Sequence, residues 1–265
     1  MENVFSIAEY CLHQNDIASK LAATHHAREL AIRGQLSYES TAPVTAISTI
    51  QFPEQPILLA PRDMPRRKLK SQAGKAAFFH ALAHIEFVAI YLAWDMLYRF
   101  RNLPDRFYQD WLKVADEEAQ HFQLIRSHLL ALGMDYGDLP AHRGLWEHAE
   151  DTANDVLARL AIVPRCMEAR GLDITPKMIE KFEKQGDTTS VKLLTRILND
   201  EVGHVEIGSY WFKVLCEQQG LNSELHYKEL IERFYVGKPK GPFNRELRII
   251  AGFTHAEIDW LEQSL

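Results

Sequence analysis

The sequence contains little cysteine and none of the patterns that cysteine-based sites use. Its three cysteines, Cys11, Cys166 and Cys216, are scattered over 265 residues without a C-x-x-C pair. Such a set excludes a rubredoxin-type iron centre within this chain and does not suggest a disulfide framework. It fits a reducing compartment, so we expect a cytoplasmic protein.

Other signals are also missing. The N-terminal residues Met-Glu-Asn-Val-Phe-Ser have neither the basic region nor the apolar region of a secretory signal. No uninterrupted run of 18 apolar residues occurs, from which we expect no membrane-spanning segment and no membrane partner. The net charge of −6 argues against a general nucleic-acid binder. No phosphate-binding glycine motif and no nucleophile elbow is found.

No low-complexity linker divides the chain, and 46% of its residues are hydrophobic, which is enough for a substantial core. We therefore expect a single domain over residues 1–265 with three parts. These parts are an N-terminal helical and irregular arm (1–70), a four-helix bundle (71–219) and C-terminal helices (220–265).

Two short motifs, at residues 117–121 and 200–204, each contain an acid, a glutamate, two spacers and a histidine. In a helix, residues three apart lie on one face. Glu118 with His121, and Glu201 with His204, therefore each present one carboxylate and one imidazole to the same point. The motif alone is weak, because about one Glu-x-x-His arises by chance in a chain of this composition.

The spacing of two further glutamates strengthens the pattern. Glu86 precedes Glu118 by 32 residues, and Glu168 precedes Glu201 by 33 residues. Both lie in apolar helical sequence, where a charge is costly unless it is paired or bound to metal. Two copies of Glu…Glu-x-x-His predict a dinuclear metal site, since four carboxylates offset the charge of two divalent cations.

Helix geometry supports the first copy independently. Apolar periodicity predicts a helix over 71–100, and Asp105 is the expected N-cap of a second helix that ends near Gly133. Glu86 lies about 15 residues before the turn at 102–105 and Glu118 about 14 residues after it. Equal counts give equal rise, so an antiparallel hairpin brings both to the same depth.

The remaining elements follow from caps and breakers. We expect N-terminal helices starting at Ser6 and Asp16 and stopping at Gly34, then irregular chain over 37–70 with one short strand at 45–50. A glycine-rich crossover at 133–144 leads to a helix over 145–170, which Pro164 should kink and Gly171 should stop. The later predicted helices start at Thr175-Pro176, run over 187–219, and lie near 223–235, 244–251 and 254–263.

Some polar residues have a simpler explanation than function. We interpret His25, His26 and Glu29 as solvated or packing residues, and the basic cluster at 62–70 as a solvated loop. At 100° per residue, His84 points away from Glu86. We therefore expect His80 and His84 to be packing histidines, with Asp95 or the N-terminal segment as their partners.

These motifs resemble those of the ferritin-like di-iron carboxylate superfamily over about 71–215. Within it, the sequence is similar to an uncharacterised bacterial ferritin-like family distantly similar to tRNA-hydroxylating di-iron monooxygenases. The resemblance implies an all-α fold, a ferritin-like four-helix bundle with one long crossover, here extended by N-terminal and C-terminal helices. It also implies six metal ligands: Glu86, Glu118, His121, Glu168, Glu201 and His204.

In that superfamily, the acid before the Glu of one motif often hydrogen-bonds the His of the other. The resemblance thus assigns Asp200 to His121 and Glu117 to His204, which would fix each imidazole tautomer. The sequence lacks the cysteine-rich domain of rubrerythrins and the radical tyrosine of ribonucleotide reductases. It also has a longer N-terminal arm than storage ferritins.

The function that we predict is a non-haem protein with two iron ions, or with manganese. It would activate O2 or peroxide to oxidise or hydroxylate a substrate, either a small molecule or a modified base, with an external electron donor. Iron handling or peroxide detoxification would use the same ligands. A third alternative is a helical interaction module in which these residues form buried salt bridges.

Overall fold

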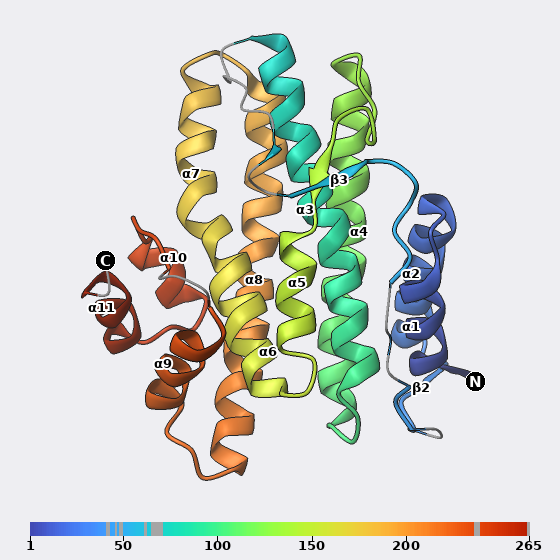
Figure 1. Ribbon diagram of the computed structural model, residues 1–265, viewed down its shortest axis with the longest axis vertical. Helices are drawn as coiled ribbons and strands as arrows, with labels where there is room; N and C mark the ends of the chain where they lie inside the picture. The colour runs from blue at the N-terminus through green and yellow to red at the C-terminus, as the bar shows by residue number, and fades with distance from the viewer. Residues whose placement is uncertain are drawn as a thin grey trace. The chain divides into compact units, whose positions relative to one another are not determined.

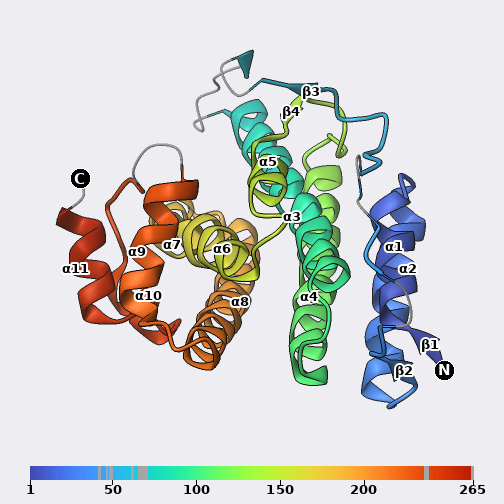
Figure 2. The same cartoon turned by 60° about the horizontal axis from the view of Figure 1, so that its bottom comes forward.

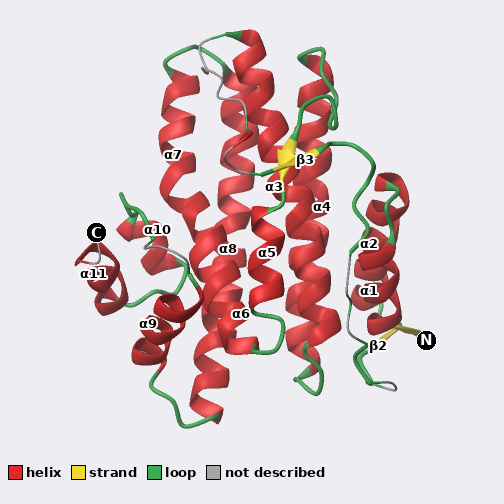
Figure 3. Ribbon diagram, in the orientation of Figure 1, coloured by secondary structure: helices red, strands yellow, loops and turns green. Residues whose placement is uncertain are grey.

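In the computed structural model, the described residues are 1–40, 43–45, 47, 50–60, 63–64, 71–235 and 239–263. Helices make up most of them, and the described strands are only two residues long (Figure 3). The chain divides into two compact units, Met1–Glu147 and His148–Leu265. The expectation of a mostly helical chain is confirmed.

The first unit begins with two helices, α1 (Val4–His13) and α2 (Ile17–Ile32) (Figure 1). The Asn3 side chain accepts a hydrogen bond from the backbone N–H of Phe5, so α1 starts before Ser6, where the sequence predicted it. Asp16 caps α2 through the backbone N–H of Ser19 at 2.7 Å, as expected. These helices pack on α3 and α4, respectively.

Helices α3 (Gln72–Arg99) and α4 (Asp105–Ala131) form the central hairpin of the first unit (Figure 1). Ser71 caps α3 through the backbone N–H of Gly74, and α3 ends one residue before Phe100. Asp105 is the first helical residue of α4 rather than its cap, which is Pro104. Their packing confirms the predicted hairpin.

Helix α3 is the core helix of the first unit. Over an 18-residue window its mean hydropathy reaches 1.6, so among the described residues this one helix could cross a membrane by length and composition alone. The search for uninterrupted apolar runs did not identify this helix, because a few polar residues interrupt its apolar sequence. Of that window, 72% is buried inside the protein, as in core helices of proteins without a membrane span.

The described strands form two short parallel pairs in the first unit. Strand β1 (Glu2–Asn3) pairs with β2 (Leu36–Ser37), and β3 (Leu58–Leu59) pairs with β4 (Ala141–His142). The strand predicted at 45–50 falls partly outside the described residues, and those described there are not in a strand. The basic cluster Arg62, Arg66, Arg67, Lys68 and Lys70 lies outside the described residues altogether.

Two predicted boundaries around the third bundle helix are wrong. Helix α5 (Gly144–Asp151) ends early, and α6 (Val156–Ile162), the π-helix η2 (Val163–Glu168) and α7 (Ala169–Glu183) then follow without a break. Gly171 therefore does not stop a helix, and Thr175-Pro176 does not start one. The packing of α7 along α8 outweighs the local cost of a glycine and a proline.

The rest of the second unit follows the predicted order. Asp187 caps α8 (Thr188–Gln218) through the backbone N–H of Ser190. The tail comprises α9 (Ser223–Phe234), α10 (Arg245–Ile250) and α11 (His255–Gln263), close to the predicted ranges. Helix α9 packs on α6 and α8, and α10 packs on α7 and α8 (Figure 2).

Each unit thus contains one packed pair of long helical segments, α3 with α4 and α7 with α8. The four-helix bundle with its long crossover, and the single domain over residues 1–265, stay predictions.

Candidate metal centre

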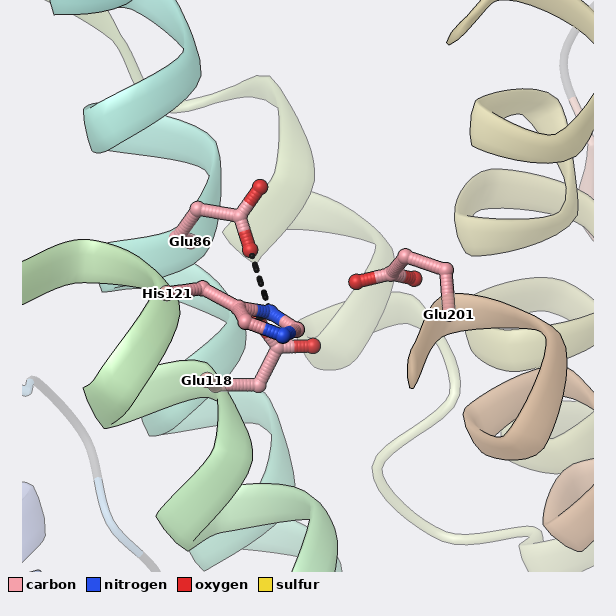
Figure 4. Close-up of side chains that lie close together, drawn as sticks. All are labelled: Glu86, Glu118, His121 and Glu201. Carbon is pink, nitrogen blue, oxygen red and sulfur yellow. Dashed lines mark hydrogen bonds and ion pairs between the residues drawn. The ribbon is translucent and has the colours of Figure 1, made fainter. Parts of the chain in front are cut away.

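The first half of the predicted centre lies on the α3–α4 hairpin. Glu86 comes from α3, while Glu118 and His121 lie one turn apart on α4. Ligand atoms of these three side chains lie within 4.8 Å of one another. Figure 4 draws them, together with Glu201 of α8, and marks the contact of His121 Nδ1 with Glu86 Oε2 at 3.2 Å. The depth argument from the turn is confirmed.

The trio is deeply buried. Glu86 is 3% exposed, Glu118 1% and His121 0%. Two carboxylates in a site that excludes water repel one another, and one imidazolium can neutralise only one of them. A bound cation would remove this imbalance, so the charge and donor set of the trio suit a metal ion.

The second half lies in the second unit. Glu201 and His204 stand one turn apart on α8, and His204 is fully buried. Glu168 is the last residue of η2, which packs against α8. Neither Glu168 nor Glu201 is exposed. The predicted effect of Pro164 takes the form of the π-helix, a distortion that often marks functional sites.

The two Glu-x-x-His motifs adopt the same local geometry. His121 Nδ1 lies 3.6 Å from Glu118 Oε2, and His204 Nδ1 lies 3.6 Å from Glu201 Oε1. In both, the nitrogen that faces the carboxylate of its own motif is Nδ1. That orientation offers Nδ1 to a metal and leaves Nε2 for a partner outside the site.

Asp200 and Glu117, the outer partners assigned to these histidines, each accept a hydrogen bond within their own helix. Asp200 accepts a hydrogen bond from Arg196 Nε at 2.7 Å, and Glu117 accepts one from Lys113 Nζ at 2.6 Å. Both carboxylates are partly buried. Their assignment to His121 and His204 stays a prediction.

Residues 13–259 match the family model described as protein of unknown function, DUF455. The chain belongs to this family. An uncharacterized protein of Haemophilus influenzae is 46% identical over 224 residues, which cover 81% of this chain and 78% of that protein. Comparison with solved structures gives no match.

Neither description names a ferritin-like fold or an activity. This DUF455 protein contains a buried cluster of carboxylates and histidine that could hold a metal ion. The ferritin-like reading therefore rests on the spacing of the motifs and on the geometry of each half.

His80 and His84 of this DUF455 protein are packing histidines, as expected. Their partners are not the predicted Asp95 or N-terminal segment. His84 contacts Tyr136 Oη through Nδ1 and the carbonyl oxygen of His142 through Nε2, each at 2.9 Å. His80 Nε2 accepts from the backbone N–H of Gly137 at 3.0 Å. Both hold the 132–143 segment on α3, which sequence periodicity does not reveal. Burial lowers the pKa of His84 to about 4, so it is neutral at pH 7.

The N-terminal histidines also have ordinary packing or surface contacts. His25 Nδ1 contacts Asp116 Oδ1 at 2.6 Å, and this partner raises the pKa of His25. His26 pairs with Glu2, and Glu29 pairs with Arg33, at the protein surface. The interpretation of these residues as solvated or packing side chains is confirmed.

Proposed function

We propose that this DUF455 protein is a non-haem dinuclear metalloprotein that uses O2 or peroxide to oxidise or hydroxylate a substrate. The observation that carries the proposal is the repeated half-site. Each unit supplies one glutamate and one Glu-x-x-His pair, and the two pairs have the same Nδ1-to-carboxylate geometry. Coincidence explains one such pair more readily than two with matching spacing and orientation.

In this proposal, the six ligands are Glu86, Glu118, His121, Glu168, Glu201 and His204. Their carboxylates would neutralise the cations, and the two imidazoles would offer Nδ1 to them. Asp200 and Glu117 would accept the outer N–H of the histidines and so keep Nδ1 free for metal. Four carboxylates with two imidazoles suit iron or manganese better than metals that prefer thiolates. Such a metal pair, when bound, supplies redox chemistry with O2 or peroxide.

The protein's own contribution is burial and orientation. Glu118 and His121 are held on one face of α4, whose neighbouring core residues Phe122 and Ala119 are fully buried. A buried donor set changes little on binding and excludes bulk water from the metals. We further propose that the protein acts in the cytoplasm with an external electron donor. Its three cysteines are free and buried.

Metal reconstitution tests the proposal. Purified protein would be stripped with a chelator, mixed with Fe(II) without oxygen, dialysed and measured for iron per chain. We expect two ions in the wild type. Glu118→Gln and Glu201→Gln should each lose one ion or bind it at least about 10-fold more weakly, because each removes a ligand charge.

Glu206→Gln is a matched control, because Glu206 is exposed on the same helix as Glu201. It should bind iron as the wild type does. A wild type that binds no iron or manganese would overturn the proposal and support a helical interaction module. Adding O2 then separates the remaining uses. If two iron ions stay bound and are oxidised and reduced repeatedly with a reductant, an oxidase is supported. If each chain oxidises many Fe(II) ions, iron handling is supported.

A further inference from the structure

The π-helix that presents Glu168 is held between α8 and the C-terminal tail. Against α8, Gly208 gives η2 its close approach, because a Cβ at Gly208 would lie 2.5 Å from Pro164 Cβ. Pro164 lacks a backbone N–H, so it cannot make the ordinary helical hydrogen bond at this position. Gly208 and Pro164 explain how η2 packs closely on α8. They do not explain what fixes the orientation of η2.

Arg165, three residues before Glu168, is fully buried and directed toward the tail. Its Nη2 donates to Glu257 Oε2 at 2.8 Å, and its Nε donates to Ser209 Oγ at 3.2 Å. The guanidinium also lies 4.3 Å from the ring centre of Tyr227 and 4.6 Å from that of Phe253. A cation in an aromatic environment with a buried carboxylate partner has little freedom to reorient.

Glu257 is itself fixed by the start of α11. The backbone N–H of Thr254 donates to Glu257 Oε2 at 2.9 Å, and the backbone N–H of Glu257 donates to Thr254 Oγ1 at 3.1 Å. This reciprocal arrangement is a capping box. One carboxylate therefore both caps α11 and receives Arg165 of η2.

A second buried ion pair holds the other side of Glu168. Arg248 of α10 forms a bidentate pair with Asp173 of α7, at 2.8 and 3.0 Å. Arg248 Nη2 also donates to the carbonyl oxygen of Ala169, the residue that follows Glu168, at 3.4 Å. The tail thus contacts the chain three residues before Glu168 and one residue after it.

We propose that the C-terminal helices position Glu168, with Arg165 and Arg248 as the positioning residues. The inference rests on the proposed function, because it takes Glu168 as a metal ligand. The tail is then a part of the metal centre's scaffold, although none of its residues is a predicted ligand.

The chemistry of the contacts favours positioning over stability alone. Replacing a buried ion pair by well-packed apolar residues is often neutral or stabilising. Here the pair also leaves Arg165 Nη1 and Glu257 Oε1 without hydrogen-bond partners among the described residues, which costs further stability. Directional contacts on both sides of one residue are what fixing its orientation requires.

Metal titration of variants tests this role. Arg165→Met removes the charge and keeps an unbranched side chain, while Glu257→Gln keeps the shape and a hydrogen bond. Manganese binding would be followed by equilibrium dialysis, with hydrogen exchange measured over residues 163–170. We expect both variants to weaken one of the two metal positions by about 10–100-fold, the range for residues that orient ligands. The other position should keep its affinity.

Arg245→Met is the matched control. Arg245 belongs to the same tail and forms surface ion pairs with Asp259 and Glu262, but it does not reach η2. It should leave both metal positions and the exchange of residues 163–170 unchanged.

The outcomes separate the two proposals. If the wild type binds no metal, the proposed function fails, and hydrogen exchange still decides whether the tail fixes η2. If the wild type binds two ions and folded Glu257→Gln binds both with unchanged affinity, the positioning role is wrong. Should Arg165→Met fail to fold, the same measurements on Glu257→Gln decide.

Discussion

Lys20 is the most unusual single residue outside the candidate centre. It is fully buried between the N-terminal helices and α3, where its ammonium lies 3.6 Å from the ring centre of Tyr91. Its Nζ also donates to the carbonyl oxygen of Cys11. Burial lowers the pKa of Lys20 to about 7, because these neutral groups replace hydration incompletely.

This shift predicts a pH-dependent stability. Lys20 titrates near pH 7 in the folded state but near pH 10.5 when unfolded, so between these values the unfolded state binds more protons. Stability should therefore rise with pH across this window. Lys20→Met removes the charge, so we expect it to stabilise the protein at pH 7 by roughly 1–3 kcal/mol. This advantage should shrink toward pH 10.

Urea unfolding of wild type and Lys20→Met at pH 7 and at pH 9.5 measures the effect. Taking the difference between the two proteins cancels the titration of other groups. Lys192→Met, at an exposed position on α8, should show no such pH-dependent difference. The prediction is contradicted if Lys20→Met is less stable than wild type at pH 7. It is also contradicted if the difference in free energy of unfolding between the two proteins is the same at both pH values.

The sequence located the candidate ligands better than their surroundings. Glu86, Glu118 and His121 could be predicted to meet because helical spacing and a short turn fix their depth. The partners of His80 and His84 could not, because they lie on the irregular 132–143 segment. No periodic pattern determines where such a segment folds back onto a helix.

Among the elements, the contact between α8 and η2 depends on Gly208. Gly208→Ala places a methyl group 2.5 Å from Pro164 Cβ, so one of the two elements must shift. Overpacking of this kind costs about 1–3 kcal/mol, against which alanine's helix propensity offsets up to about 1 kcal/mol. We expect a net loss of stability, together with weaker metal binding if Glu168 moves with η2.

Gly203→Ala provides the control on the same helix. Nothing lies within 4 Å of a Cβ at Gly203, so this change should stabilise the protein by up to about 1 kcal/mol. Denaturant unfolding of both variants gives the comparison. If Gly208→Ala proves as stabilising as Gly203→Ala, the close packing of η2 on α8 does not hold in solution.

The elements that the sequence predicted well have local signals at their ends. Ser71 and Asp187 cap α3 and α8, and the tail helices follow clear turn residues. The helical segment that runs without a break from α6 through η2 to α7 was not predicted, because Gly171 and Pro176 both favour a break in a helix. Packing along α8 decides that region, and a single sequence does not show which helix will be its neighbour.

For the whole molecule, the important feature is that the predicted ligands are divided equally. Glu86, Glu118 and His121 belong to the first compact unit, while Glu168, Glu201 and His204 belong to the second. The proposed dinuclear function needs all six, three from each unit. Metal binding would then contribute to the stability of both units.

We therefore predict that metal changes how the chain unfolds. Ligand that binds only the folded state stabilises it by about 2.7 kcal/mol at 100 times its Kd, which is roughly 5–10 °C in Tm for a chain of this size. Calorimetry should show one transition with saturating Mn(II). Metal-free protein should melt lower and with a broader or divided transition, because repulsion among the carboxylates is then uncompensated.

The double variant Glu118→Gln and Glu201→Gln has a ligand missing from each unit, so Mn(II) should leave its melting almost unchanged. Equal melting of metal-free and Mn(II)-saturated wild type would contradict the proposal that these six residues bind metal together.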